Sequence, residues 1–83
     1  MINNRQAYNL IKQQFSEYKI LYSIEFPDFY AFNVEPKNIG NRKYIGAMMA
    51  VSKKDGKIGQ FNPLMHKRED IARAMQKRVD YKE

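Results

Sequence analysis

The chain opens with a helical pattern of apolar residues. Over residues 3–18 the apolar side chains recur at three- and four-residue spacing, which places them on one face of a helix. They are Ala7, Leu10, Ile11, Phe15 and Tyr18. Asn3 or Asn4 can accept hydrogen bonds from the free amides of the first turn. The pattern therefore predicts an amphipathic helix over residues 3–18.

From residue 19 the apolar period changes from 3.6 to 2, the period of a strand with one buried face. The alternating residues are Ile20, Tyr22, Ile24 and Phe26, followed after Pro27-Asp28 by Tyr30, Phe32 and Val34. Proline cannot extend a strand ladder and aspartate favours turns. We therefore expect two strands, over 19–26 and 29–35, joined as an antiparallel hairpin.

The second half of the chain predicts two more strands and a helix. Residues 44–52 are apolar on both faces, which is typical of a central or covered strand. Asp55-Gly56 then indicates a hairpin turn, followed by a short strand near 57–61. Asn62-Pro63 suits a helix start, and a second helix lies within residues 64–79, beginning either there or near Arg68. The tail after residue 79 is expected to fray.

These elements predict one α+β domain over residues 1–83, in the order α-β-β-β-β-α. Four antiparallel strands form a meander packed against one or two helices. The second helix carries its own apolar stripe, which comprises Ile71, Ala72, Met75 and Val79. The expected core comprises Leu10, Ile11, Phe15, Ile24, Phe32, Val34, Met49, Val51, Ile71 and Met75.

The composition favours a globular cytoplasmic protein. The 83 residues include no cysteine, so the chain has neither disulfides nor thiolate metal ligands. Hydrophobic residues make up 43 % of the chain, but no apolar run reaches the length of a membrane span. We expect a cytoplasmic location, the host cytoplasm if a phage encodes the protein, and no membrane partner.

The charge is unevenly distributed. The net charge is +6, but residues 1–36 carry −1 and residues 37–83 carry +7. Candidates for binding a polyanion are Lys53, Lys54, Lys57, Arg73 and Lys77. The alternative is an ordinary solvated surface, because Glu69 and Asp70 lie one turn before Arg73 and can pair with it. The basic turns that flank the third strand should also lie at opposite ends of the sheet.

No catalytic, cofactor-binding or metal-binding set is recognisable. His66 is the only histidine, so neither a multi-histidine metal site nor a serine triad is indicated, and we expect a surface or capping residue. Glu25 and Glu35 lie on neighbouring predicted strands, and could form a carboxylate pair or two separate solvated edge charges. No glycine-rich nucleotide motif occurs. We expect no enzyme activity and no cofactor.

Two further surfaces remain open. Strand aromatics can stack nucleic-acid bases, although their alternation with aliphatic residues favours core packing. Those aromatics are Tyr22, Tyr30, Phe32 and Tyr44. Methionines can form an adaptable contact surface or fill gaps in a small core. Those methionines are Met48, Met49, Met65 and Met75.

Part of the chain resembles a known group of proteins. The segments are residues 29–37 (FYAFNVEPK), 50–58 (AVSKKDGKI) and 61–64 (FNPL). They resemble short uncharacterised phage and prophage proteins of Gram-positive bacteria, and the hairpin is similar to that of small immunity domains of the YrhB type. The resemblance covers residues 26–64 and implies a helix–sheet–helix fold and a mobile-element setting. The chain departs from the pattern of these proteins at Ser52, where aspartate is usual, and the resemblance implies no activity.

The sequence thus leads to one functional expectation and one alternative. We expect a small non-enzymatic binding or accessory protein, encoded by a phage or mobile element, that contacts another protein or a second copy of itself. The alternative is a small basic protein that binds nucleic acid through the second helix and the lysine-rich turns.

Overall fold

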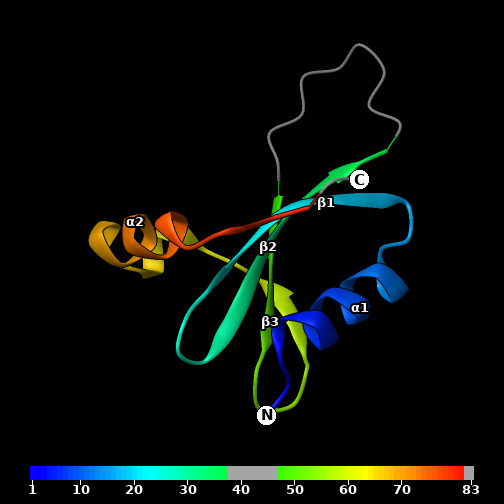
Figure 1. The fold of residues 1–83 in the computed structure, drawn as a ribbon, viewed down its shortest axis with the longest axis horizontal. Helices are drawn as coiled ribbons and strands as arrows, with labels where there is room; N and C mark the ends of the chain where they lie inside the picture. The colour runs from blue at the N-terminus through cyan, green and yellow to red at the C-terminus, as the bar shows by residue number, and fades with distance from the viewer. Residues whose placement is uncertain (38–46, 82–83) are drawn as a thin grey trace.

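The fold is a five-stranded antiparallel sheet with one helix on each face, in a computed structural model that describes residues 1–37 and 47–81 (Figure 1). The elements are α1 (Asn4–Gln14), β1 (Tyr18–Glu25), β2 (Phe29–Pro36), β3 (Ala47–Ser52), β4 (Ile58–Gln60), the 3-10 helix η1 (Pro63–Met65), α2 (Arg68–Gln76) and β5 (Val79–Asp80). The predicted α+β class and element order are confirmed, with η1 and β5 as additions. The strand order in the sheet is β4-β3-β2-β1-β5. Residues 44–46 of the predicted third strand, with Arg42 and Lys43 before it, lie outside the described residues.

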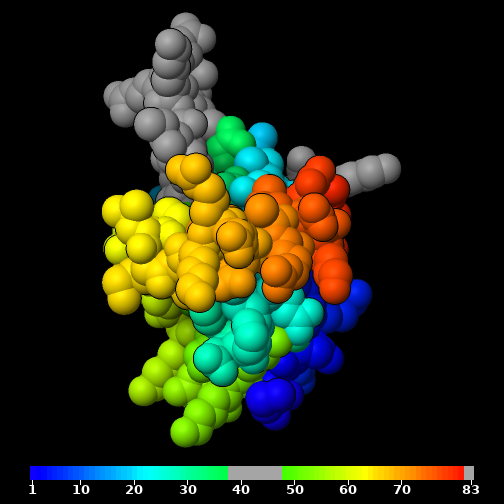
Figure 2. Space-filling model, turned by 90° about the vertical axis from the view of Figure 1, so that its left-hand side faces the viewer, coloured from blue at the N-terminus to red at the C-terminus, as the bar shows by residue number. Residues whose placement is uncertain are grey.

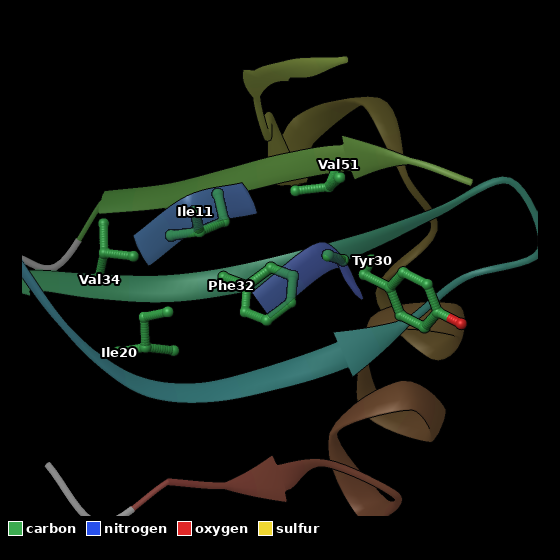
Figure 3. Close-up of a cluster of buried hydrophobic side chains, with 7 residues drawn as sticks. Ile11, Ile20, Tyr30, Phe32, Val34 and Val51 are labelled. Carbon is green, nitrogen blue, oxygen red and sulfur yellow. The ribbon is translucent and has the colours of Figure 1, made fainter. Parts of the chain in front are cut away.

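The first face of the sheet packs against α1. Ala7 and Ile11 of the helix are fully buried against the even-numbered residues of β2, with Phe32 at the centre (Figure 3). The predicted burial of Ile11, Ile24, Phe32, Val34 and Val51 is confirmed. The other five predicted core residues are only half-buried, because they lie at the rims of the two helix–sheet contacts. They are Leu10, Phe15, Met49, Ile71 and Met75.

A bulge in β1 divides its apolar residues between the two faces. Ile20 pairs with Val34, but Tyr22 pairs with Asn33, so Leu21 is an extra residue in the ladder. An extra residue reverses the alternation that follows it. Ile20 therefore packs under α1, whereas Ile24 belongs to the cluster under α2. The prediction that these residues share one face was wrong for this reason.

Both helices are shorter than predicted. The capping box of Asn3 and Gln6 is present, but α1 ends at Gln14, because Phe15 caps it and residues 15–17 form the turn into β1. Tyr18, which was predicted to be helical, begins β1. The second helix was predicted to cover at least residues 69–78, but α2 ends at Gln76, and Val79 of the predicted stripe lies in β5. In α2 the residues that pack on the sheet are Ile71, Ala74 and Met75, while Ala72 is exposed. Of the two predicted starts for the second helix, the later one is correct, because α2 begins at Arg68. The earlier one is the site of the separate 3-10 helix η1, which begins at Pro63.

The described part of the predicted tail, residues 80 and 81, pairs with the sheet rather than fraying, while residues 82–83 lie outside the described residues. Val79 and Asp80 pair with Ser23 and Tyr22 of β1, and the Tyr81 amide donates to the Leu21 carbonyl at 2.9 Å. This short ladder makes β5 the sheet edge beyond β1. Within residues 1–37 and 47–81, neither α1 nor α2 has the length and apolar character needed to cross a membrane.

A closed polar network ties this tail to the first turn of α1. The Asn4 amide donates to the Ser23 hydroxyl at 2.9 Å, and the Tyr81 hydroxyl donates to the Asn4 carbonyl at 2.6 Å. The Ser23 and Tyr81 oxygens lie 3.1 Å apart. Tyr81 has one hydroxyl proton, which Asn4 accepts, so Ser23 is the donor to Tyr81. Three buried or half-buried polar side chains thereby satisfy one another in a ring.

Candidate functional site

An aromatic cluster marks one end of the α2 face. Phe26 and Phe29 flank the β1–β2 turn and stack at 4.8 Å between ring centroids, and Phe61 follows β4. The His66 ring lies over Phe61 at 5.2 Å with an angle of 11° between the planes. It also lies within 5.5 Å of the rings of Phe26 and Phe29. The only histidine of the chain is thus packed among three phenylalanines, as well as capping η1.

The turn that follows Phe61 presents two apolar side chains to solvent. The Asn62 side chain accepts from the Leu64 amide at 3.0 Å, and its carbonyl accepts from the Met65 amide at 3.1 Å. Pro63 fixes its own φ angle at the start of this turn. Leu64 is nevertheless 92 % exposed and Met65 78 % exposed. We call these two residues the apolar knob.

A depression of about 340 Å³ lies beside the apolar knob. Its lining residues are Phe29, Ala50, Gln60, Phe61, Asn62, Met65 and His66. Gly59 of β4, opposite Ala50, adds no side chain at this point, and the space where its Cβ would lie is open. The knob and the depression together form an apolar surface at the β4 edge of the sheet. Figure 2 shows the face that carries α2 in orange, with the yellow segment around η1 beside it.

A second hollow, of about 440 Å³, separates α2 from the β1–β2 turn. Its charged lining residues are Glu25, Asp28, Asp70, Arg73 and Lys77. Three carboxylates thus face two cations, so the hollow has no excess of positive charge that would attract phosphate. Among the described residues, no group of three or more histidine and carboxylate side chains is placed to hold a metal ion.

Lys53, one of the candidates for polyanion binding, is a buried residue. It is only 8 % exposed, and its ammonium donates to Glu25 at 2.7 Å and lies 4.9 Å from the centre of the Tyr30 ring. Its backbone bonds to Asp28 and Ile2, so it joins the N-terminus to two hairpins. The ammonium of Lys53 therefore already has Glu25 and the face of the Tyr30 ring as partners, and its backbone is hydrogen-bonded as well.

The other four candidates are more accessible. Lys54 and Lys57 lie in the β3–β4 turn, whose Gly56 has the positive φ of 74° expected for Asp-Gly. The Lys57 amide donates to the Asp55 carboxylate at 3.0 Å, which lowers the pKa of Asp55 below the ordinary value. The Lys57 ammonium also lies 4.0 Å from Asp55.

Arg73 lies on α2 and Lys77 is the C-terminal cap of that helix. Lys77 borders a hollow of about 290 Å³ with Lys53 and Glu25. The structure thus brings Lys53 and Lys77 together, with a carboxylate between them. It does not join all five candidates into one basic surface. Lys37 follows the C-terminal end of β2, whereas the β3–β4 turn adjoins its N-terminal end, where Phe29 pairs with Ser52. Lys37 is therefore far from the lysines of that turn.

The two carboxylates proposed as a possible pair are separated along the sheet. Glu35 pairs with Lys19 in the β1–β2 ladder, with 3.9 Å between their charged atoms, whereas Glu25 lies opposite Tyr30 at the other end. The reading as two separate edge charges is therefore correct. Among the strand aromatics, Tyr30 and Phe32 are buried under α1, which leaves Tyr22 half-exposed for any stacking contact.

Sequence reasoning found only half of the apolar knob. Met65 was among the methionines named for a possible contact surface and is the exposed one of the four, whereas Leu64 was not singled out. Leu64 was assigned to the possible start of the second helix, where it would have been expected to join an apolar stripe. The signal was present, because the positions three and four residues after Leu64 and Met65 are Lys67, Arg68 and Glu69. An apolar pair with only charged helical neighbours cannot continue the stripe of α2.

The chain matches no protein-family model, and comparison with curated proteins and with solved structures finds no significant match.

Proposed function

We propose that this chain is a non-enzymatic binding protein that contacts another protein through the apolar knob. The observation that carries the proposal is the exposure of Leu64 and Met65 on a turn whose backbone is fixed by hydrogen bonds. A rigid turn loses little conformational entropy on binding, so exposed apolar area there contributes efficiently to affinity.

The surroundings of the knob distinguish it from ordinary surface exposure. Single exposed apolar side chains are common in soluble proteins and need no explanation. Here the two side chains adjoin a depression lined by Phe29, Phe61 and His66. A contiguous apolar projection and hollow with a polar rim is typical of a protein-binding surface.

The absence of a catalytic role is part of the same proposal. His66 is stacked on Phe61, and a general base also needs a nucleophile and an orienting group within reach. We further propose the biological setting that the resemblance implies, in which the chain is an accessory protein of a phage or mobile element and acts in the host cytoplasm. Nucleic-acid binding is the rival reading, and the burial of Lys53 weakens it.

The test is a selection of short random peptides displayed on filamentous phage, carried out against the parent chain and against Leu64→Ser/Met65→Ser. We expect the parent to enrich peptides that the double variant binds about tenfold or more weakly, because the apolar contact area is removed. The matched control is Val79→Thr, a polar change at an exposed apolar residue on the opposite edge of the sheet. It should retain parental affinity.

Equal binding by the parent and the double variant, or enrichment of no peptide, would contradict the proposal. Sedimentation equilibrium of both proteins identifies self-association as a separate outcome, in which the parent is a dimer and the double variant a monomer. Because Leu64 and Met65 make few internal contacts, both proteins should have the same unfolding midpoint.

A further inference from the structure

The outer edge of β4 is a free strand edge beside the apolar knob. β4 is the last strand of the sheet, and among the described residues no strand pairs with its outer side. Ser52 donates to the Lys57 carbonyl, and Phe61 donates to the Met48 carbonyl. Inward-facing and outward-facing backbone groups alternate along an antiparallel strand. The amides and carbonyls of Ile58 and Gln60 therefore point away from the sheet.

Apart from its length of only three residues, this edge lacks the features by which proteins block strand pairing. Edges are usually protected by proline, by an inward-pointing charge or by a bulge. The three residues of β4 are Ile58, Gly59 and Gln60, and the β3–β4 register is continuous through them. Gly59 and Gln60 are also exposed to solvent.

Gly59 leaves room for a side chain from a neighbouring strand. Its inward partner is Ala50, so this position faces the α2 side, where the depression beside the apolar knob begins. No heavy atom lies within 4 Å of the place where a Cβ on Gly59 would be. Directly opposed side chains on paired strands are about 5 Å apart. A residue opposite Gly59 on an added strand can therefore lie over the bare glycine and enter the depression.

We infer that an extended, acidic segment of a partner protein adds to the sheet as a sixth strand on β4. It places one apolar side chain opposite Gly59, in the depression between Phe61 and the apolar knob. This inference rests on the proposed protein-contact function and specifies how the contact is made. Main-chain hydrogen bonds supply affinity in this mode, and the pockets for alternate side chains supply specificity.

The charge around the edge determines the chemistry of the segment. Lys54 and Lys57 precede β4 and Lys67 and Arg68 follow η1, all of them exposed. The carboxylates of the same segments are Asp55, Glu69 and Asp70, so the cations exceed the carboxylates by one. Carboxylates that flank the apolar residue of the segment would meet this positive rim. A second copy of the chain is disfavoured as the occupant, because each copy carries a net charge of +6.

The closing experiment uses the peptides selected against the parent chain as probes. Gln60→Pro removes one outward amide, and Gly59→Val fills the space opposite the partner side chain. Gly59 does not have a positive φ, so valine fits there without backbone strain. The matched control is Ile58→Val, a change on the same strand at a side chain that packs against the cluster under α1 and does not line the depression.

We expect Gly59→Val and Gln60→Pro each to weaken binding about tenfold or more, and Ile58→Val to change it by no more than about twofold. Peptide binding should also slow hydrogen exchange of the Ile58 and Gln60 amides, and the selected peptides should be rich in aspartate and glutamate and bind more weakly as salt is raised. Thermal unfolding of each variant establishes that it is folded.

The outcomes separate this inference from the proposed function. If Leu64→Ser/Met65→Ser abolishes binding while Gly59→Val, Gln60→Pro and the two amides show no effect, the knob contact stands and strand addition is wrong. Selected peptides without acidic residues would overturn the assigned chemistry. A selection that enriches no peptide would overturn both proposals.

Discussion

Lys53 is a basic residue whose role is internal rather than solvent-facing. Its ammonium is held between Glu25 and the Tyr30 ring, and its main chain bonds to the N-terminus and to the β1–β2 turn. A long side chain in this position contributes through its methylene stem as well as its charge. The residue therefore stabilises the end of the sheet at which three segments meet.

Lys53→Ala should lower the free energy of unfolding by about 1–3 kcal/mol, because it removes a charge-assisted hydrogen bond and the packing over Tyr30. Urea denaturation gives this value directly. The control is Lys54→Ala, the exposed neighbour in the same turn, which should change stability by no more than about 0.5 kcal/mol. Similar stability for both variants would show that the ion pair between buried Lys53 and exposed Glu25 contributes nothing.

The ring of Asn4, Ser23 and Tyr81 provides a second test at the level of single atoms. Tyr81→Phe removes one hydroxyl from the ring and leaves the stacking of Tyr81 on Tyr8, at 4.8 Å, available to phenylalanine. Ser23 is then buried without its acceptor, so we expect a loss of about 1–3 kcal/mol in denaturant unfolding. In the background of Ser23→Ala the same change should cost less, since the buried donor is gone. Equal costs in both backgrounds would mean that the hydroxyls are not coupled.

At the scale of the elements, β2 carries the two cores on its opposite faces. Phe32 is fully buried under α1, whereas Phe29 is half-buried in the aromatic cluster on the α2 side. Phe32→Ala should cost about 3–5 kcal/mol, because the cavity lies in a closed core. Phe29→Ala should cost less, since solvent can fill the space that it leaves. Thermal melting of both variants compares the two losses of stability. A larger loss for Phe29→Ala than for Phe32→Ala would mean that the α2 face holds the main core.

The elements also show how far periodicity alone predicts this fold. Spacing identified both helices and the first two strands, because each carries apolar residues with a recognisable period. The third strand was predicted from an apolar run and the fourth from the Asp55-Gly56 turn. It could not locate the bulge at Leu21, since leucine there fits either register and the shift is set by pairing with β2. β5 was missed because two residues have no period, and Asp80 is held by a partner strand more than fifty positions earlier. Of the apolar knob, Met65 was named as a possible contact residue, whereas Leu64 was detectable only through the charged residues that follow it.

At the scale of the whole molecule, the charge asymmetry of the sequence does not become a single basic face. Of the five candidates for polyanion binding, Lys53 is buried on Glu25 and Lys57 lies beside Asp55. Arg73 and Lys77 share their hollow with Asp28 and Asp70. Positive potential is therefore interrupted wherever two of these cations come near each other.

Salt dependence is the measurement that separates a phosphate-binding surface from this interrupted one. If about four cations contacted phosphates, raising salt from 50 to 200 mM would release condensed counterions and weaken duplex binding roughly 100-fold. We expect instead feeble binding that disappears near physiological salt of about 0.15 M. Titration of labelled duplex and single-stranded oligonucleotides with the parent chain, at each salt concentration, measures the affinity for both forms of nucleic acid.

Arg73→Glu/Lys77→Glu and Lys54→Glu/Lys57→Glu form a matched pair in this titration, since each reverses two exposed charges on a different element. With no dominant basic surface, both variants should reduce the residual low-salt binding by similar factors. They act only through net charge, which falls from +6 to +2 in each. Sub-micromolar affinity at physiological salt that only the α2 variant abolishes would instead identify α2 as a nucleic-acid surface. In that case Arg73 and Lys77 would outweigh the carboxylates of Asp28 and Asp70 beside them.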